Sequence, residues 1–207
     1  VFCESSSEIE IIHRNNAANQ EIIDSFFLHQ ETDSKIKFLS AAFGGRLYRS
    51  NFELLINGES CDNNIGVLML GSEDNHIDCH ANINHLSGNS KNNFLCRSLM
   101  KDNSKGIFNG KILVAKGAEG TDSELNNNNL ILSDNAGVQS NPQLEIYSED
   151  VKCAHGSTTG NLDEEAIFYL KSRGINEKDS RKILVEGFIG KLLSKFNSCL
   201  VKLIFLF

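Results

Sequence analysis

Two residues in the last third of the chain, Cys153 and His155, have the types and the spacing of a metal-binding or nucleophilic pair. Side chains two residues apart lie on the same face of an extended backbone, so we expect the thiol and the imidazole to point the same way. Such a pair can ligate iron or zinc, or act as nucleophile and base. Because two ligands do not complete a four-coordinate site, a metal site here requires donors from elsewhere or from a partner chain. A buried cysteine beside a hydrogen-bonded histidine is the alternative interpretation.

A second group of metal-ligand types occurs at His76, Asp78 and His80, with Cys79 between them and His85 five residues after His80. In a strand, His76, Asp78 and His80 would share one face, and Cys79 would point to the other. Three such groups on one face could bind a divalent metal. The interpretation that we favour is the polar outer face of a strand.

The elements that position these residues are short strand-like runs, separated by Gly, Asn, Asp and Ser corners from about residue 37 to 155. This rhythm predicts either an antiparallel sandwich or barrel, or a parallel β-solenoid. Asn109-Gly110 would leave a hairpin arm of only two or three residues, so we place it at a solenoid corner and expect a mainly β fold built as a parallel β-helix. The expected strands are 9–13, 21–29, 37–43, 47–56, 65–70, 77–86, 94–100, 107–114, 130–132 and 144–147.

The chain contains 16 Gly, about two dozen Asn and one Pro. Both Gly and Asn enter left-handed backbone conformations, so this surplus suggests many tight corners made without proline. Four of the Asn form the run 126–129. Stacked Asn at inward bends can form hydrogen-bonded ladders, which is one interpretation of the run. A disordered polar loop is the other, and the sequence leaves both open.

The last part of the chain changes to helical patterns. Asp163 can cap a helix over 164–173 that ends at Gly174. Asn176 can cap a second helix, whose apolar stripe we expect at Ile183, Leu184, Phe188 and Leu192. We therefore expect a β-helix core over residues 1–161 and a C-terminal helical region over 162–207.

Composition excludes several classes of protein. A net charge of -7 lacks the basic footprint of a nucleic-acid binder. No apolar run is long enough for a membrane-spanning helix, and the apolar tail 199–207 is too short. The six cysteines form no CxxC motif, which indicates reduced thiols. The common nucleotide, hydrolase and zincin signatures are absent, and no signal peptide is visible.

The stretch 142–158, continuing through 162–175, closely resembles the C-terminal signature of the SufD family, a subunit of the SUF iron–sulfur cluster assembly system. Segments 44–51, 106–112 and 121–134 are similar to family segments in the same order. The resemblance extends over about residues 37 to 188. In the paralogue SufB the motif histidine is usually followed by Glu, whereas Gly156 follows His155 here, and this favours SufD.

The resemblance implies a right-handed parallel β-helix that acts as a scaffold without turnover of its own. It implies pairing with a SufB-like paralogue through the β-helix end, and binding of a SufC-like ABC ATPase through the C-terminal helices. A transient iron–sulfur cluster would form at the junction of the two paralogues. His155 matches the family's cluster-site and metal-binding histidine, and Cys153 matches the neighbouring motif cysteine.

The family's N-terminal helical region and early coils have no counterpart here, so we expect residue 1 to lie within the β body and the piece alone to dissolve poorly. The expected compartment is the cytoplasm, or the plastid stroma in a eukaryote. Two alternatives stay open. One is a secreted polar β-solenoid that acts on or binds carbohydrate, and the other is a degenerate SufD relic without function.

Overall fold

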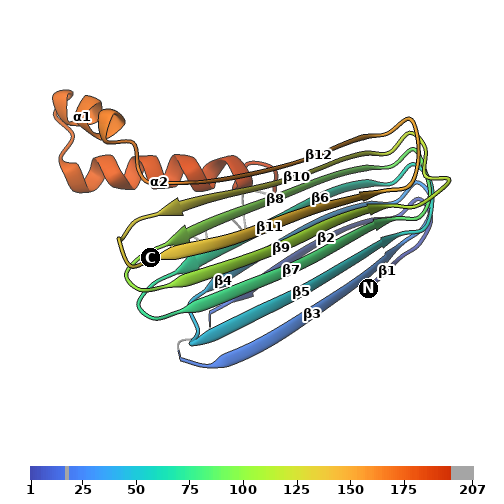
Figure 1. Ribbon diagram of the computed structural model, residues 1–207, viewed down its shortest axis with the longest axis horizontal. Coiled ribbons are helices and arrows are strands. Elements are labelled where there is room, and N and C mark those ends of the chain that lie inside the picture. The colour runs from blue at the N-terminus through green and yellow to red at the C-terminus, as the bar shows by residue number, and fades with distance from the viewer. Residues whose placement is uncertain (17–18, 197–207) are drawn as a thin grey trace.

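The computed structural model describes residues 1–16 and 19–196. It consists of two facing parallel sheets followed by two helices (Figure 1). Sheet A contains, in spatial order, β1 (Phe2–Cys3), β3 (Glu21–Gln30), β5 (Leu47–Ile56), β7 (His76–His85), β9 (Lys105–Val114) and β11 (Gly137–Ile146). Sheet B contains β2 (Glu8–Asn15), β4 (Lys35–Phe43), β6 (Asp62–Gly71), β8 (Lys91–Met100), β10 (Asp122–Ile131) and β12 (Lys152–Gly160).

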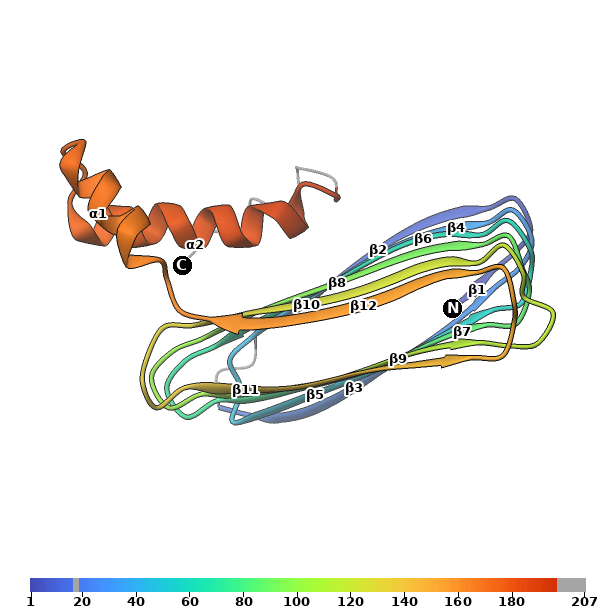
Figure 2. The same ribbon diagram turned by 45° about the horizontal axis from the view of Figure 1, so that its top comes forward.

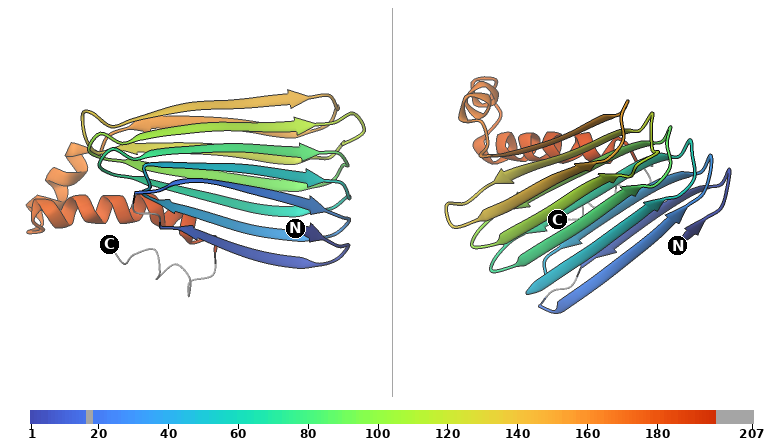
Figure 3. Two further views of the ribbon diagram at one scale, coloured as in Figure 1. Left: turned by 90° about the horizontal axis from the view of Figure 1, so that it is seen from below. Right: turned by 45° about the vertical axis from the view of Figure 1, so that its right-hand side comes forward.

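Consecutive strands lie in opposite sheets, and each strand pairs in parallel with the strand two positions along the chain. The chain therefore winds as a solenoid, one strand of each sheet per coil (Figures 2 and 3). This confirms the predicted parallel β-helix and excludes the antiparallel sandwich. A parallel arrangement keeps like positions of successive coils in register, so each inward position forms a row along the solenoid.

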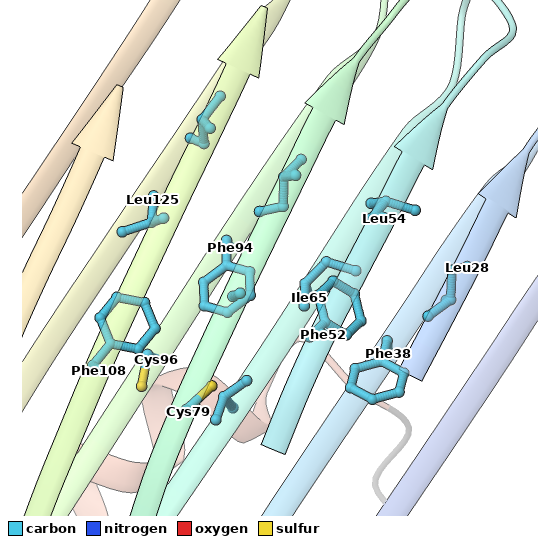
Figure 4. Packing of buried hydrophobic residues seen from close by; sticks show 14 of the residues in the cluster. Leu28, Phe38, Phe52, Leu54, Ile65, Cys79, Phe94, Cys96, Phe108 and Leu125 are labelled. Carbon is cyan, nitrogen blue, oxygen red and sulfur yellow. The ribbon is translucent and has the colours of Figure 1, made fainter. Parts of the chain in front are cut away.

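The interior between the sheets is filled by apolar side chains. A row of phenylalanines runs through it, with ring centroids 4.8 Å apart for Phe38 and Phe52 and 5.8 Å apart for Phe94 and Phe108 (Figure 4). Phe38, Phe94 and Phe108 are at most 1% exposed. Each buried aromatic ring removes a large apolar area from water, so this row contributes strongly to the stability of the coils.

We expected asparagine to form many of the tight corners, but other residue types occupy most of the corner positions that have positive φ. The non-glycine residues with positive φ include Ser6, Asp33, Ser60 and Asp102, whereas Asn89 is the one asparagine among those described. Most of the asparagines that were expected at corners lie in strands instead. Short polar side chains of several types can hydrogen-bond locally and tolerate this conformation, so Asn is not required there.

The corner predicted at Asn109-Gly110 is wrong, and neither of the two interpretations of the run 126–129 holds. Asn109-Gly110 lies in the middle of β9, and the run 126–129 lies within β10 as neither a bend nor a loop. Asn127 and Asn129 are buried inside the solenoid, where Asn129 Nδ2 donates to Asn127 Oδ1 at 2.8 Å. Pairing with the strands on both sides outweighs the weak β propensity of Asn in this run.

The helices follow the predicted caps. Asp163 Oδ1 accepts from Glu165 N at 2.9 Å and caps α1 (Glu164–Ser172). Asn176 Oδ1 accepts from Asp179 N at 2.9 Å and caps α2 (Glu177–Leu193). In the described part of the chain, neither helix is long and apolar enough to cross a membrane.

Helix α2 packs on the outer face of sheet B (Figure 2). Ile189, Leu192 and Leu193 form a buried cluster with strand residues such as Leu68. Of the predicted stripe, Leu192 is buried, but Ile183 is 43% exposed because only the C-terminal half of the helix reaches the sheet. The division into two domains at residue 161 stays a prediction, and the apolar tail 199–207 lies outside the described residues.

Candidate functional site

Cys153 and His155 lie in β12, the last strand of sheet B. Parallel pairing with β10 places Cys153 beside Ser123 and His155 beside Leu125. The side chains of Ser123 and Leu125 are buried inside the solenoid. Because partners in register share a face, Cys153 and His155 both point to the interior side of the sheet. They therefore lie on one face, as the sequence predicts.

This interior face is open at the last coil. Strand β12 has β10 on one side and no described strand on the other, so it is the edge of sheet B (Figure 2). His155 is exposed, whereas Cys153 is half-buried and packs against the apolar core. The two side chains thus stand where the filled interior of the solenoid meets solvent, and an approaching protein or ion can reach His155.

The surroundings of Cys153 disfavour the thiolate. Burial raises the pKa of the Cys153 thiol, and the negative charge of Asp122 adds to this, while a hydrogen bond with the backbone of Ser123 opposes it. The free thiol is therefore the main form at neutral pH. A metal that binds Cys153 must displace this proton, because thiolate is the ligand form.

Polar groups line the rest of the open end. Ser157 Oγ lies 2.8 Å from Ser140 Oγ and joins β12 to β11 across the interior. Asn129 Nδ2 donates to Thr159 Oγ1 at 3.1 Å. The inward residues of β12 after His155 are thus hydroxyl residues that are held by hydrogen bonds. Such an end tolerates contact with water, unlike the apolar interior of the earlier coils.

A buried polar group behind Cys153 was not predicted from the sequence. His85 Nε2 lies 3.1 Å from Ser123 Oγ, and Asn92 Nδ2 donates to the same oxygen at 3.1 Å. His85 is fully buried, and burial lowers its pKa to about 4. His85 follows His80 by five residues, and this odd spacing within β7 places it on the face opposite to His76 and His80.

The group at His76, Asp78 and His80 lies on the outer face of sheet A, as favoured. His80 Nε2 is 3.0 Å from Asp78 Oδ1, and Arg49 Nη1 is 3.3 Å from Asp78 Oδ2. The carboxylate of Asp78 therefore already has a cationic partner on β5.

Over residues 1–16 and 19–196, no three or more His, Cys, Asp or Glu side chains form a group that could hold a metal ion.

The arrangement of Cys153 and His155 on β12 is suited to one chemical role, which is partial coordination of a metal centre. It presents one thiol and one imidazole on a common face of an open strand edge. Two ligands can hold part of an iron or zinc centre, and the remaining donors must come from outside residues 1–16 and 19–196, because no group of three or more ligand residues forms within them. The structure brings Cys153 and His155 to one face and keeps His76 and His80 apart from them, on the outside of the other sheet.

Comparisons with known proteins give a consistent result. Residues 1–188 match the family model described as SUF system FeS cluster assembly, SufBD core domain. The chain is 38% identical to the iron-sulfur cluster assembly protein SufD of Escherichia coli over 153 residues, which cover 74% of this chain and 36% of that protein. It is 28% identical to a SufBD family protein of Synechocystis over 194 residues, which cover 93% of this chain and 42% of that protein.

A plant protein is also similar. The chain is 27% identical over 172 residues to the chloroplastic protein ABCI7 of Arabidopsis thaliana, with 82% of this chain and 36% of that protein covered. The matched region therefore amounts to less than half the length of each of these relatives.

Proposed function

This chain belongs to the SufBD family of iron–sulfur cluster assembly proteins, and from that premise we propose that it is a scaffold subunit of a SUF assembly complex. It pairs with a SufB-like paralogue through the open end of the solenoid. The nascent iron–sulfur cluster, which is the cargo of the complex, forms where the two subunits meet. His155 is the ligand that this chain contributes, and Cys153 stands beside it.

The observation that carries this proposal is the position of Cys153 and His155 on the open inner face of the edge strand β12. An edge strand presents unpaired backbone donors and acceptors, so a second chain can pair with it directly. A subunit bound there would bring its own side chains beside His155 and complete the ligand set. The half-buried Cys153 would then lose its remaining contact with solvent.

The helices support a second part of the proposal, binding of a SufC-like ABC ATPase. Phe168 and Tyr169 on α1 are 73% and 57% exposed. Adjacent exposed aromatic side chains are typical of protein-binding surfaces. Helix α2 is anchored to sheet B by its C-terminal half, so α1 stands away from the solenoid (Figure 1). ATP hydrolysis would be the partner's activity, and this chain would provide the docking surface.

We place the complex in the cytoplasm of a bacterium or the stroma of a plastid. The relatives by name include a bacterial SufD and a chloroplastic protein. Membership of the SufBD family leaves the carbohydrate-binding alternative without support.

The test is co-expression of the chain with its SufB-like and SufC-like partners, followed by anaerobic reconstitution with iron and sulfide. The variant is His155→Ala, and the matched control is His76→Ala, which removes a partly exposed histidine from the outer face of sheet A. We expect all three complexes to assemble and only His155→Ala to lose the cluster. Absence of a complex with the unmodified chain would contradict the scaffold proposal, and it is also the result expected of a degenerate relic.

A further inference from the structure

A row of alternating charges runs along the outer face of sheet B, at the first residue of every strand. The parallel registers place each member beside the next. In spatial order the row is Glu8, Lys35, Asp62, Lys91, Asp122 and Lys152. All six side chains are exposed. At the paired positions of the neighbouring strands, each charge in the row therefore has only opposite charges.

The alternation is specific to this row. The next outward row of sheet B consists of Glu10, Lys37, Asn64, Asn93, Glu124 and Ala154, and its charges do not alternate. Directly opposed unlike charges stabilise strand pairing, and like charges destabilise it. The row that begins with Glu8 thus favours the observed register at every strand pair of sheet B. It does so by electrostatic attraction between solvent-exposed side chains.

The row ends at the edge strand with Lys152, whose positive charge is matched on one side only. Lys152 faces Asp122 on one side, and its other side is the open edge of β12. Within the described residues Lys152 makes no ion pair. The same holds for the other described members of the row except Glu8, whose Oε1 lies 3.4 Å from Nζ of Lys37 in the next outward row. What distinguishes Lys152 is therefore its position, with an opposite charge in register on one side only. A strand that pairs with β12 will place one of its own side chains beside Lys152.

We propose that the strand of the partner subunit that pairs with the edge of β12 carries a carboxylate beside Lys152, so that the alternating row continues across the interface. This inference rests on the proposed pairing through the solenoid end. It adds the interaction that selects the partner, which is the contact between its carboxylate and Lys152. A carboxylate at this position aligns the partner strand and selects one register. A partner with Lys or Arg there is rejected, because like charges would be opposed.

The register matters for the site itself. Lys152 precedes Cys153 in β12, so the position that pairs with Lys152 fixes which partner residues lie beside Cys153 and His155. A slip of one residue would turn every partner side chain to the other face. The charge at Lys152 therefore positions the partner's ligands although Lys152 itself points away from the interior.

The test measures the dissociation constant between the full chain and its SufB-like partner. The variants are Lys152→Glu and Lys152→Gln, and the matched control is Lys101→Glu, which makes the same charge change at an exposed residue between β8 and β9. We expect Lys152→Glu to weaken binding about three- to tenfold at low salt, Lys152→Gln to weaken it less, and Lys101→Glu to have no more than about a twofold effect. The difference shrinks as salt is added.

The partner's residue is found by zero-length carbodiimide cross-linking of Lys152 and mass spectrometry. Reversal of that carboxylate to Lys should restore the affinity of Lys152→Glu. Equal affinities for Lys152→Glu and Lys101→Glu would overturn the inference while leaving the scaffold proposal intact. The inference is also overturned if Lys152→Gln increases self-association without weakening the partner complex. Lys152 would then serve only to prevent β12 from pairing with other copies of the chain. If the unmodified chain does not bind the partner, the proposed function fails first.

Discussion

The hydroxyl oxygens of Ser157 and Ser140 lie 2.8 Å apart and join the last strands of the two sheets at the open end of the solenoid. Both residues point inward, one coil beyond the buried Phe108. The contact holds the edge strand that carries Cys153 and His155 against its neighbour in the other sheet. At the open end, this hydrogen bond between side chains therefore adds to the apolar packing of Val138, Leu144 and Cys153 against the core.

Removal of this contact should loosen β12. We expect Ser157→Ala to lower the free energy of unfolding by about 0.5 kcal/mol and to speed amide hydrogen exchange in β12 more than elsewhere. The control is Ser25→Ala, which removes an exposed hydroxyl that accepts a hydrogen bond from Asn51 on the outer face of sheet A. Equal exchange in β12 for both variants would show that the Ser157–Ser140 contact does not hold the edge strand.

The phenylalanine row should dominate the stability of the solenoid. Phe94 is fully buried between Phe52 and Phe108, so Phe94→Ala should lower the free energy of unfolding by about 3–5 kcal/mol. Phe168→Ala removes the same atoms from a side chain that is 73% exposed and should change it by less than about 0.5 kcal/mol. Urea denaturation measures both. Comparable losses would mean that the interior row is not the main source of stability.

The buried His85 should make stability depend on pH. Burial lowers the pKa of His85 to about 4, whereas the unfolded chain titrates near 6.5. Between these values the unfolded chain takes up a proton that the folded chain does not, so stability is retained above pH 6.5 and is lost as the pH falls towards 4. The loss should be on the order of 2–3 kcal/mol.

The variant that tests this is His85→Gln, with His76→Gln as the control. Urea denaturation between pH 4 and 7 should give a shallower pH dependence for His85→Gln and an unchanged one for His76→Gln. The same slope in both variants would assign the pH dependence to other groups.

The guanidinium of Arg97 should contribute little to stability through its charge. Arg97 is 7% exposed under α2, lies 4.7 Å from the centre of the Phe188 ring, and has no carboxylate partner among the described residues. Burial lowers its pKa. We expect Arg97→Met to leave the free energy of unfolding unchanged or to raise it by up to about 1 kcal/mol, because an apolar side chain of similar length avoids that desolvation. A loss of more than about 1 kcal/mol would show that the cation–π contact outweighs desolvation.

The thiols should differ in reactivity according to their burial. Burial raises the pKa of Cys153, and it raises the pKa of the fully buried Cys96 to about 12. In the native protein at pH 7.5, iodoacetamide should modify Cys153 more slowly than an unhindered cysteine and should not modify Cys96. The rate at Cys153 should rise with pH as the thiolate forms. Mass spectrometry of tryptic peptides measures both, and modification of Cys96 at the rate of Cys153 would contradict the sealed interior.

Much of the fold follows from local sequence signals. Asp163 and Asn176 mark the starts of both helices because a cap depends on residues close in sequence. Cys153 and His155 share a face because the alternation of a strand decides it. Their position at an open edge does not follow from spacing, since it depends on how many coils precede and follow the strand.

The misplaced corners have a different cause. The runs around Asn109 and Asn126 carry turn-type residues, yet both lie within ten-residue strands. Strands β9 and β10 are held by parallel neighbours on both sides, so the coil before and the coil after determine their conformation. The contact between His85 and Ser123 was missed for the same reason, because it joins residues 38 positions apart in facing sheets.

The central claim is that His155 of this chain binds the cluster at the junction with the SufB-like subunit. The most direct measurement uses a complex in which only this chain carries ¹⁵N-labelled histidine, reconstituted with a cluster and reduced to a paramagnetic state. Pulsed electron paramagnetic resonance then reports any imidazole nitrogen bound to iron. We predict a ¹⁵N coupling typical of a ligating histidine that disappears in His155→Ala and persists in His76→Ala. A cluster that forms without a ¹⁵N coupling, or one whose coupling survives in His155→Ala, would contradict the account.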